Sequence, residues 1–251
     1  MAMPNGRPIL LLTKSQRLVE VLLEHGPMTP AEIGEAIGVP RPTAYRLVSG
    51  LNAIELTQTR PDGTVDLNLR WLHLADAAYD SMSEWAGSHA ALEALAAETE
   101  QTAYLCVPRV DEAVCIDWSQ GRGIGVLMLR PGLSLPLNAG AAGRTMLAYL
   151  PDVTDYLTAA PHNAFTPKSL TDAAALKADI EQTRQRGYAV SHEDVTVGIG
   201  ALGVPVLGAG GVLRGTVSLG GLIGEIRERE QDLVAAIRDT VRDLGGAPAA
   251  S

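Results

Sequence analysis

Thr29 to Leu51 is the stretch that most constrains the fold, because its residues predict two short helices joined by a tight turn. Pro30 suits the first turn of a helix, where its missing N–H is not needed, and Gly38 suits the left-handed residue that ends that helix. In the next segment, apolar residues recur at i, i+3, i+4 and i+7, which predicts one buried helix face. These residues are Ala44, Leu47, Val48 and Leu51. We expect a helix-turn-helix, with an ordinary helical hairpin as the alternative.

The flanking segments extend this unit to a winged helix. Upstream, apolar and charged residues alternate at helical spacing between Arg17 and Glu24, and Gly26 with Pro27 ends that helix. Downstream, the chain reads as a strand, an Asp-Gly turn and a second strand. These segments are Leu56 to Arg60, Pro61 to Gly63 and Thr64 to Leu67. The order predicts a winged helix-turn-helix domain over residues 10–70.

One face of the second helix stays outside this predicted core. It offers two arginines, a tyrosine and small hydroxyl residues, which suit a recognition helix in the major groove of DNA. The predicted DNA-binding residues are Arg41, Pro42, Thr43, Tyr45, Arg46 and Ser49, with Arg60 from the wing. We expect Arg41 and Arg46 to reach bases or phosphates, and Arg60 to enter the adjoining minor groove. Asp62 and Asp66 flank Arg60, so the wing should add little affinity.

The net charge of −9 lies outside the predicted DNA-binding domain. Up to Ala75 the chain carries seven basic and seven acidic residues, whereas the remainder carries 13 basic and 22 acidic residues. Non-specific binding depends on neutralising phosphates, so such a chain should contact double-stranded DNA only locally, as a dimer. No segment approaches the roughly 18 apolar residues of a membrane helix, which predicts a cytoplasmic protein without a membrane partner. The length of 251 residues indicates more than one domain.

Residues 71–87 are expected to form a helical linker. The stretch from Trp71 to Glu100 has no proline and a single glycine, Gly87. An apolar stripe at helical spacing runs through its first half. It consists of Leu72, Ala75, Tyr79 and Met82. Such a stripe needs a surface to cover it, and a twin helix from a second subunit and the chain's own domain are the two alternatives.

From Thr102 onward, strands and glycine turns dominate the pattern. The candidate strands are Ala103 to Pro108, Ala113 to Trp118, Ile124 to Leu129, Ser134 to Leu137, Ala201 to Leu207 and Val212 to Leu219. The candidate helices are Ala141 to Leu150, Thr171 to Arg186 and Ile226 to Leu244. Hairpins without regular βαβ alternation predict an α+β domain over residues 88–246, with a mixed antiparallel sheet and flanking helices.

Catalytic and metal chemistry find little support in the residue pattern. Ser191 to Asp194 contains nucleophile, base and acid types, but successive side chains of an extended chain point to opposite faces. His192 and Asp194 share a face without a visible third metal ligand. Cys106 and Cys115, on a predicted hairpin, are expected to be reduced thiols, with a disulfide as the alternative. We expect no enzyme activity, metal or cofactor.

Three stretches carry a resemblance that spans nearly the whole chain. They are VPRPTAYRLVSGL at Val39 to Leu51, LPLNAGAAGRTMLAYL at Leu135 to Leu150, and GYAVSHEDVTVGIGALGVPVLGAGGVLRGTVSLGG at Gly187 to Gly221. With the order of winged helix, helical linker and α+β domain, the chain resembles the IclR family of bacterial transcriptional regulators. The resemblance implies a dimer or tetramer whose C-terminal GAF-like domain binds a small organic effector.

The residues themselves favour a small acid as the ligand of that domain. Asn138 to Gly143 packs small residues directly before a predicted helix, whose first N–H groups suit an anion. The effector contacts implied by the resemblance are Ile124, Leu127, Leu135, Ala141, Ala142, Gly143, Ser191, Ile199, Ala201, Ser218 and Gly220. Where the family's small-keto-acid sites have an acid, a cysteine and a second serine, this chain has Ser191, Ala201 and Gly220. A roomier, less polar pocket for a bulkier or more apolar acid is expected, with a closed core lacking a ligand as the alternative.

The function expected is therefore an effector-controlled transcriptional regulator. A homo-oligomer would place two recognition helices on a pseudo-palindromic operator, and the effector would change their spacing or angle through the linker. The alternative is a ligand-binding or interaction module whose winged helix contacts protein instead of DNA. Effector identity, operator sequence, and activation or repression are not determined by these residues.

Overall fold

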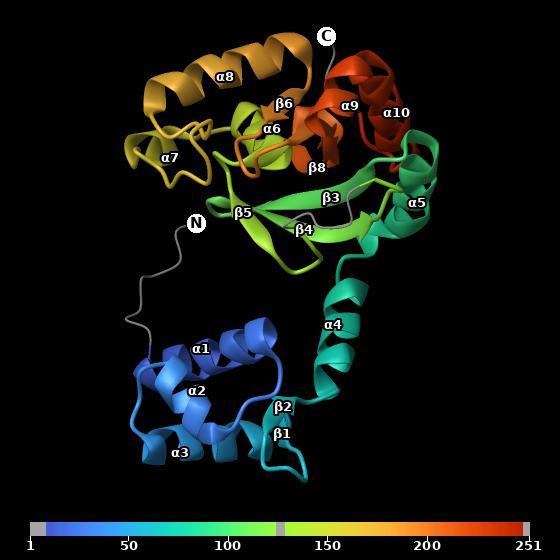
Figure 1. Ribbon diagram of the computed structural model, residues 1–251. Coiled ribbons are helices and arrows are strands. Elements are labelled where there is room, and N and C mark those ends of the chain that lie inside the picture. Colours follow the sequence, from blue (N-terminus) through green and yellow to red (C-terminus); the bar gives the residue numbers. More distant parts are fainter. Residues whose placement is uncertain (1–8, 124–128, 248–251) are drawn as a thin grey trace. The chain divides into compact units, whose positions relative to one another are not determined.

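The computed structural model describes residues 9–123 and 129–247. The chain divides after Glu84 into two compact units, which Figure 1 shows with their helices and strands labelled. The first unit contains the helix-turn-helix, the wing and helix α4. The second contains a six-stranded sheet with helices on both faces. No helix among the described ranges is long and apolar enough to cross a membrane.

Three helices form the core of the first unit. They are α1 (Leu10–His25), α2 (Pro30–Ala36) and α3 (Arg41–Ala53). Thr29 and Glu32 start α2 with a capping box, because the Thr29 hydroxyl accepts from the Glu32 N–H at 3.3 Å and the Glu32 carboxylate accepts from the Thr29 N–H at 2.8 Å. Gly26 and Gly38, both at positive φ, follow α1 and α2. The helix-turn-helix predicted from the sequence is confirmed.

The buried face of α3 is the one that the apolar spacing predicts, whereas in α1 Leu18 and Leu22 are buried and Leu23 is 66% exposed. The cluster consists of Leu18, Leu22, Ile33, Ile37, Leu47, Val48 and Leu51 from the helices, with Val65 from the wing. The wing is a hairpin of β1 (Thr57–Thr59) and β2 (Val65–Leu67), antiparallel as expected. Val65 also exchanges two backbone hydrogen bonds with Met28, which ties the wing to the segment before α2.

Helix α4 (Arg70–Asp80) follows the wing and buries none of its residues. Its first turn is held by the Trp71 indole N–H, which donates to the Leu56 carbonyl at 2.7 Å. Farther along, Leu72 is 69% exposed and Tyr79 is 47% exposed. Within the first unit, Leu72, Ala75 and Tyr79 of the apolar stripe predicted for the linker are therefore exposed, whereas Met82 is half-buried. A 3-10 turn, Ser83–Trp85, comes next.

The sheet of the second unit has the order β5-β4-β3-β8-β7-β6, and all neighbouring strands are antiparallel. Its strands are β3 (Thr102–Arg109), β4 (Glu112–Ser119), β5 (Ser134–Pro136), β6 (Ala189–His192), β7 (Ile199–Leu207) and β8 (Leu213–Leu222). Its helices are α5 (Ser88–Thr99), α6 (Gly140–Tyr149), α7 (Thr154–Thr158), α8 (Ala173–Arg186), α9 (Ile223–Glu228) and α10 (Glu230–Asp243), with a 3-10 turn at Ala209–Gly211. The α+β fold with an antiparallel sheet is confirmed.

The helices cover the sheet in layers. Helix α6 packs on one face, and α8 packs on α6, whereas α5 and α10 contact strands from the other side (Figure 1). Tyr104 and Cys106 of β3 belong to the cluster beside α6, together with Met146 and Leu147 of α6 and Leu176 of α8. The sheet face toward α6 is therefore the one on which a site can form.

Three elements differ from the sequence prediction. β6 and α7 are short and were not expected, and the single C-terminal helix expected from Ile226 to Leu244 is broken into α9 and α10. The break is at Arg229, whose ψ of 18° leaves the helical range. The expected strand Ile124 to Leu129 falls largely at 124–128, outside the described residues.

Candidate functional sites

The outer face of α3 carries the residues predicted to contact DNA. Arg41, Pro42, Tyr45, Arg46 and Ser49 are exposed, with Tyr45 at 56%, and Thr43 is half-buried. Because the helix has 3.6 residues per turn, these residues lie on the face opposite the buried one. The structure thus presents one helix face with two guanidinium groups and without acidic side chains, which is suited to a phosphate-lined groove.

The predicted wing contact is already paired within the wing. Arg60 leaves the end of β1, and its guanidinium forms an ion pair with the Asp66 carboxylate on β2. Asp62 accepts hydrogen bonds from the N–H and hydroxyl of Thr64, which fixes the turn. An arginine that shares its charge with a neighbouring carboxylate attracts phosphate less strongly. The geometry agrees with a wing that adds little affinity.

The second unit contains a pocket between α6 and the sheet. It encloses about 80 Å³, and its wall is mostly apolar. The predicted effector residues that line it are Leu135, Ala141, Ala142, Gly143, Ser191, Ile199, Ala201, Ser218 and Gly220. Every predicted effector residue that the structure describes is in this set. Ile124 and Leu127 lie outside the described residues.

Glycines bring α6 close to its neighbours at the pocket. A Cβ on Gly203 of β7 would lie 2.7 Å from the Thr145 hydroxyl and 2.8 Å from the Ala141 carbonyl oxygen. A Cβ on Gly143 would lie 2.9 Å from backbone atoms of Leu137. Both distances are too short for a side chain, so these two glycines allow the first turn of α6 to lie directly against the sheet.

The start of α6 leaves backbone donors unused at the pocket. Gly140, at φ 68°, donates its N–H to the Asp194 carboxylate at 3.1 Å. Within the described ranges, no acceptor bonds the N–H groups of Ala141 and Ala142, which follow Gly140 in the first turn. Two adjacent N–H groups at the positive end of a helix dipole form a binding position for an anion or another acceptor.

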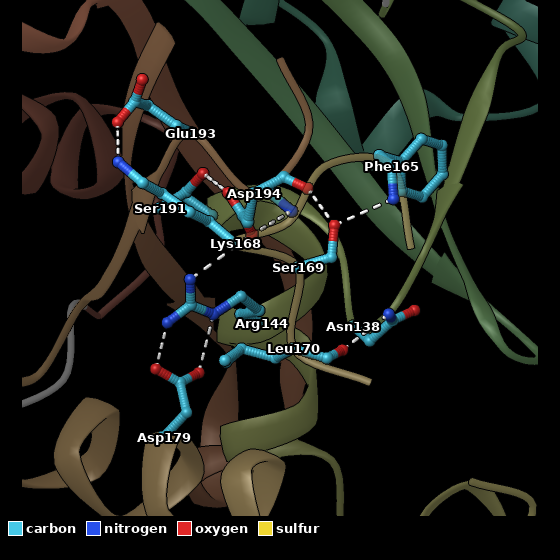
Figure 2. A network of polar contacts seen from close by, with 12 residues as sticks. Asn138, Arg144, Phe165, Lys168, Ser169, Leu170, Asp179, Ser191, Glu193 and Asp194 are labelled. Atoms are coloured by element: carbon cyan, nitrogen blue, oxygen red, sulfur yellow. Dashed lines mark hydrogen bonds and ion pairs between the residues drawn. The ribbon is translucent and has the colours of Figure 1, made fainter. Parts of the chain in front are cut away.

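A buried ion network holds this helix start in place (Figure 2). Arg144, 7% exposed, makes a two-pronged contact with Asp179 of α8, including a 2.8 Å hydrogen bond from Nε to Oδ2. Its Nη1 donates to Asp194 at 3.4 Å. Burial alone lowers the pKa of Arg144, but the hydrogen bonds and charges of the two aspartates outweigh burial and raise it. The guanidinium is therefore neutralised by the chain itself and is not available to a ligand.

Ser191 belongs to the same network. Its hydroxyl donates to Asp194, whose second oxygen holds Gly140 and Arg144 (Figure 2). Ser191 still lines the pocket, where its oxygen can accept but its proton is already committed. Ser169 adds a 2.6 Å hydrogen bond to the Asp194 backbone carbonyl, so the segment after β6 is fixed from two sides.

The other chemistry-bearing side chains of the described residues do not gather into a metal-ligand cluster. Burial, followed by the charge of Arg227, lowers the pKa of His192, which favours a neutral imidazole. No cluster of three or more metal-ligating side chains occurs among the residues that could be placed. Cys106 and Cys115 face each other across β3 and β4 as free, buried thiols, and a hydrogen bond to Cys115, followed by burial, raises the pKa of Cys106.

Sequence reasoning missed several residues that line the pocket. They are Tyr104, Ala113, Leu129, Ala139, Gly140, Val195, Thr196 and Leu219. Tyr104 carries the least expected feature, a buried hydroxyl for which the described part of the chain supplies no hydrogen-bond partner. Its position on the strand predicted from Ala103 to Pro108 was visible in the sequence, but its orientation toward α6 was not.

Comparison with known proteins agrees with both units. The family model described as "Bacterial transcriptional regulator IclR C-terminal" matches residues 78–245, and the "Sugar-specific transcriptional regulator TrmB" model matches residues 17–66. The probable transcriptional regulator SauR of Cupriavidus necator is 29% identical over 195 residues, covering 76% of this chain and 77% of SauR.

Solved structures show the same architecture. An IclR transcriptional regulator from Alicyclobacillus acidocaldarius has a TM-score of 0.78 at 27% identity, covering 94% of this chain and 97% of its own. An IclR homolog from Microbacterium hydrocarbonoxydans, complexed with 4-hydroxybenzoate, has a TM-score of 0.80 at 19% identity, covering 93% and 97%.

A winged helix-turn-helix joined to a GAF-like domain with a pocket defines a DNA-binding transcriptional regulator. Within that class, the chain belongs to the IclR family of bacterial transcriptional regulators.

Proposed function

We propose that this protein binds a pseudo-palindromic operator as a homo-oligomer and that a small organic carboxylic acid, bound in the pocket beside α6, modulates this binding. The observation that carries the proposal is the start of α6. Two N–H groups without acceptors among the described residues, those of Ala141 and Ala142, lie in the wall of a largely apolar pocket. Such a site accepts one anionic group and an apolar body.

The exposed face of α3 supports recognition of DNA bases. Arg41 and Arg46 are free of ion pairs with the described residues, so their guanidinium groups can form paired hydrogen bonds to guanine or contact phosphates. The neutral charge balance of residues 1–75 limits non-specific affinity. Two half-sites on one operator compensate for the weak affinity of each.

The exposed stripe of α4 supports assembly of two chains. Leu72 is 69% exposed, and no residue of the helix is buried. Apolar residues at helical spacing on an exposed helix are covered at low cost by the same helix of a second chain, in a two-fold arrangement.

The pocket supports a monocarboxylic acid as the effector, and the apolar wall supports a hydrocarbon body. The Microbacterium homolog holds 4-hydroxybenzoate, so aromatic acids belong in the set to be tested. An effector can change operator affinity only by binding two conformations unequally. The first turn of α6, with its buried Arg144, is the element that the acid would bias.

The test is a gel shift of the full chain against the DNA upstream of its own gene, at two salt concentrations and with a panel of acids. Arg46→Ala should cost about 1–3 kcal/mol of specific binding if Arg46 reads a guanine. Arg17→Ala, which removes an exposed arginine of α1 that is not predicted to touch DNA, is the matched control. Equal operator affinity of the two variants would reject the role of Arg46, and absence of DNA binding would favour an interaction module.

A further inference from the structure

The buried hydroxyl of Tyr104 is a polar group that nothing described so far explains. Tyr104 lies in β3 and is 5% exposed, and it is one of the residues that line the pocket. Its hydroxyl has no hydrogen-bond partner among the described residues. Buried hydroxyl groups are nearly always bonded, because an unsatisfied one loses its hydration without replacement.

The surroundings of Tyr104 hold its ring in place without satisfying its hydroxyl. Trp118 of β4 stacks on the ring, with the two centroids 6.5 Å apart. The thiols of Cys106 and Cys115 belong to the same buried cluster and are only weak hydrogen-bonding groups. Burial raises the pKa of the Tyr104 hydroxyl, so it keeps its proton and acts as a donor at neutral pH.

The register of the sheet places a second hydroxyl on the same face. Tyr104 of β3 lies directly opposite Ser218 of β8, and both line the pocket. Residues directly opposite each other on neighbouring strands project to the same side of the sheet. The polar groups on the sheet side of the pocket are thus hydroxyls, whereas the α6 side offers backbone N–H groups.

We propose, resting on the function proposed above, that the effector is an oxygen-substituted carboxylic acid, whose carboxylate is held by the N–H groups of Ala141 and Ala142 and whose hydroxyl or keto oxygen accepts a hydrogen bond from Tyr104. Tyr104 is then the residue that determines specificity among acids with the same hydrocarbon body. A site that hydrogen-bonds a ligand oxygen rejects the analogue that lacks it, because the protein group is left unpaired.

The apolar wall between the two polar sides favours this ligand over a longer or more polar one. Leu135, Ala113 and Ala201 are among the lining residues, and they offer no side-chain hydrogen bonds. The ligand therefore needs polar atoms only at its two ends. A ligand hydroxyl can accept a hydrogen bond from Tyr104 and donate one to Ser218. A keto oxygen has no proton to donate, so it would only accept the hydrogen bond from Tyr104.

The experiment is calorimetric titration of the full chain with matched acids. The probes are benzoate with 3- and 4-hydroxybenzoate, and butanoate with 3-hydroxy- and 3-oxobutanoate. For the wild type, at least one substituted acid should bind about tenfold more tightly than its parent. In Tyr104→Phe this ratio should fall to about one, with the affinity of the parent acid unchanged.

Tyr188→Phe is the matched control, since it also removes a buried tyrosine hydroxyl, one that donates to Glu230 at 2.7 Å outside the pocket. It should keep the wild-type ratio and lower the unfolding midpoint. Tyr104→Phe should leave the midpoint of the ligand-free protein equal or higher, because it removes an unpaired group. The unfolding midpoint thus tests, without any ligand, whether the Tyr104 hydroxyl is unpaired in the folded protein.

Three results would overturn the inference. Parent acids that bind and alter operator affinity with no preference for the substituted acids would reject the role of Tyr104 and leave the proposed function standing. An unchanged ratio in Tyr104→Phe would do the same. If no acid of the panel binds or alters operator affinity, both this inference and the acid-effector proposal fail together.

Discussion

Gly203→Ala tests whether the close contact between β7 and α6 positions the pocket. The added Cβ would lie 2.7 Å from the Thr145 hydroxyl and 2.8 Å from the Ala141 carbonyl oxygen. Ordinary contact begins at 3.4 Å, so the first turn of α6 must retreat from β7 by about 0.7 Å. That retreat also stretches the 3.1 Å hydrogen bond from Thr145 to the Gly203 carbonyl beyond bonding distance.

The expected cost follows from these two effects. Overpacking a close-packed contact costs about 1–3 kcal/mol, and a lost hydrogen bond costs about 1 kcal/mol. The variant should therefore be less stable by roughly 2–4 kcal/mol. For a domain of this size, each kcal/mol lowers the midpoint by about 2–4 °C, so scanning calorimetry should show a fall of roughly 5–15 °C.

The same retreat should weaken effector binding, since it moves the N–H groups of Ala141 and Ala142 away from the sheet. Gly224→Ala is the matched control: Gly224 is in α9, and an added Cβ has no atom within 4 Å. It should leave ligand affinity unchanged and stability equal or slightly higher. An unchanged midpoint and effector affinity for Gly203→Ala would refute the claim that this contact positions the pocket.

Two further predictions concern charged groups. Asp66→Asn should release Arg60 for phosphate contact and steepen the salt dependence of operator binding by about one unit; an unchanged slope in gel shifts would show that Arg60 does not approach DNA. Burial and the charge of Arg227 lower the pKa of His192, so on acidification His192 is protonated in the unfolded chain before it is protonated in the folded one. The stability of the protein should therefore fall as the pH drops below about 6.5. Urea titrations of His192→Gln should show a shallower fall. Comparison with the wild type cancels the contribution of His89, whose pKa is raised by Asp117 and which acts in the opposite direction.

The recognition helix could be predicted from the sequence because its determinants are local. Ala44, Leu47 and Val48 are buried and Arg46 is exposed, as the helical period requires. The capping residues of α2 also lie within four positions of each other. The residues that determine these helices are therefore all contained in a short stretch of the chain.

The pocket was predictable only in part. Nine of its lining residues came from the resemblance to a family, because no local pattern brings Leu135 and Ser218 together. The ion network of Arg144 was not predictable, since its partners Asp179 and Asp194 lie 35 and 50 residues away in the chain. The missing partner of the Tyr104 hydroxyl is likewise a property of the packed domain. The break at Arg229 escaped prediction because the apolar stripe continues across it.

Two carboxylates share the single guanidinium group of Arg144, and this affects how much negative charge an effector can carry. Arg144 balances only one of Asp179 and Asp194, so the support of the pocket retains an excess carboxylate next to the start of α6. A monoanion can be held there by the N–H groups, but a dicarboxylate would place its second charge in the field of that carboxylate at low dielectric. For the effector proposed above, a second carboxylate should therefore weaken binding, whatever the shape of the molecule.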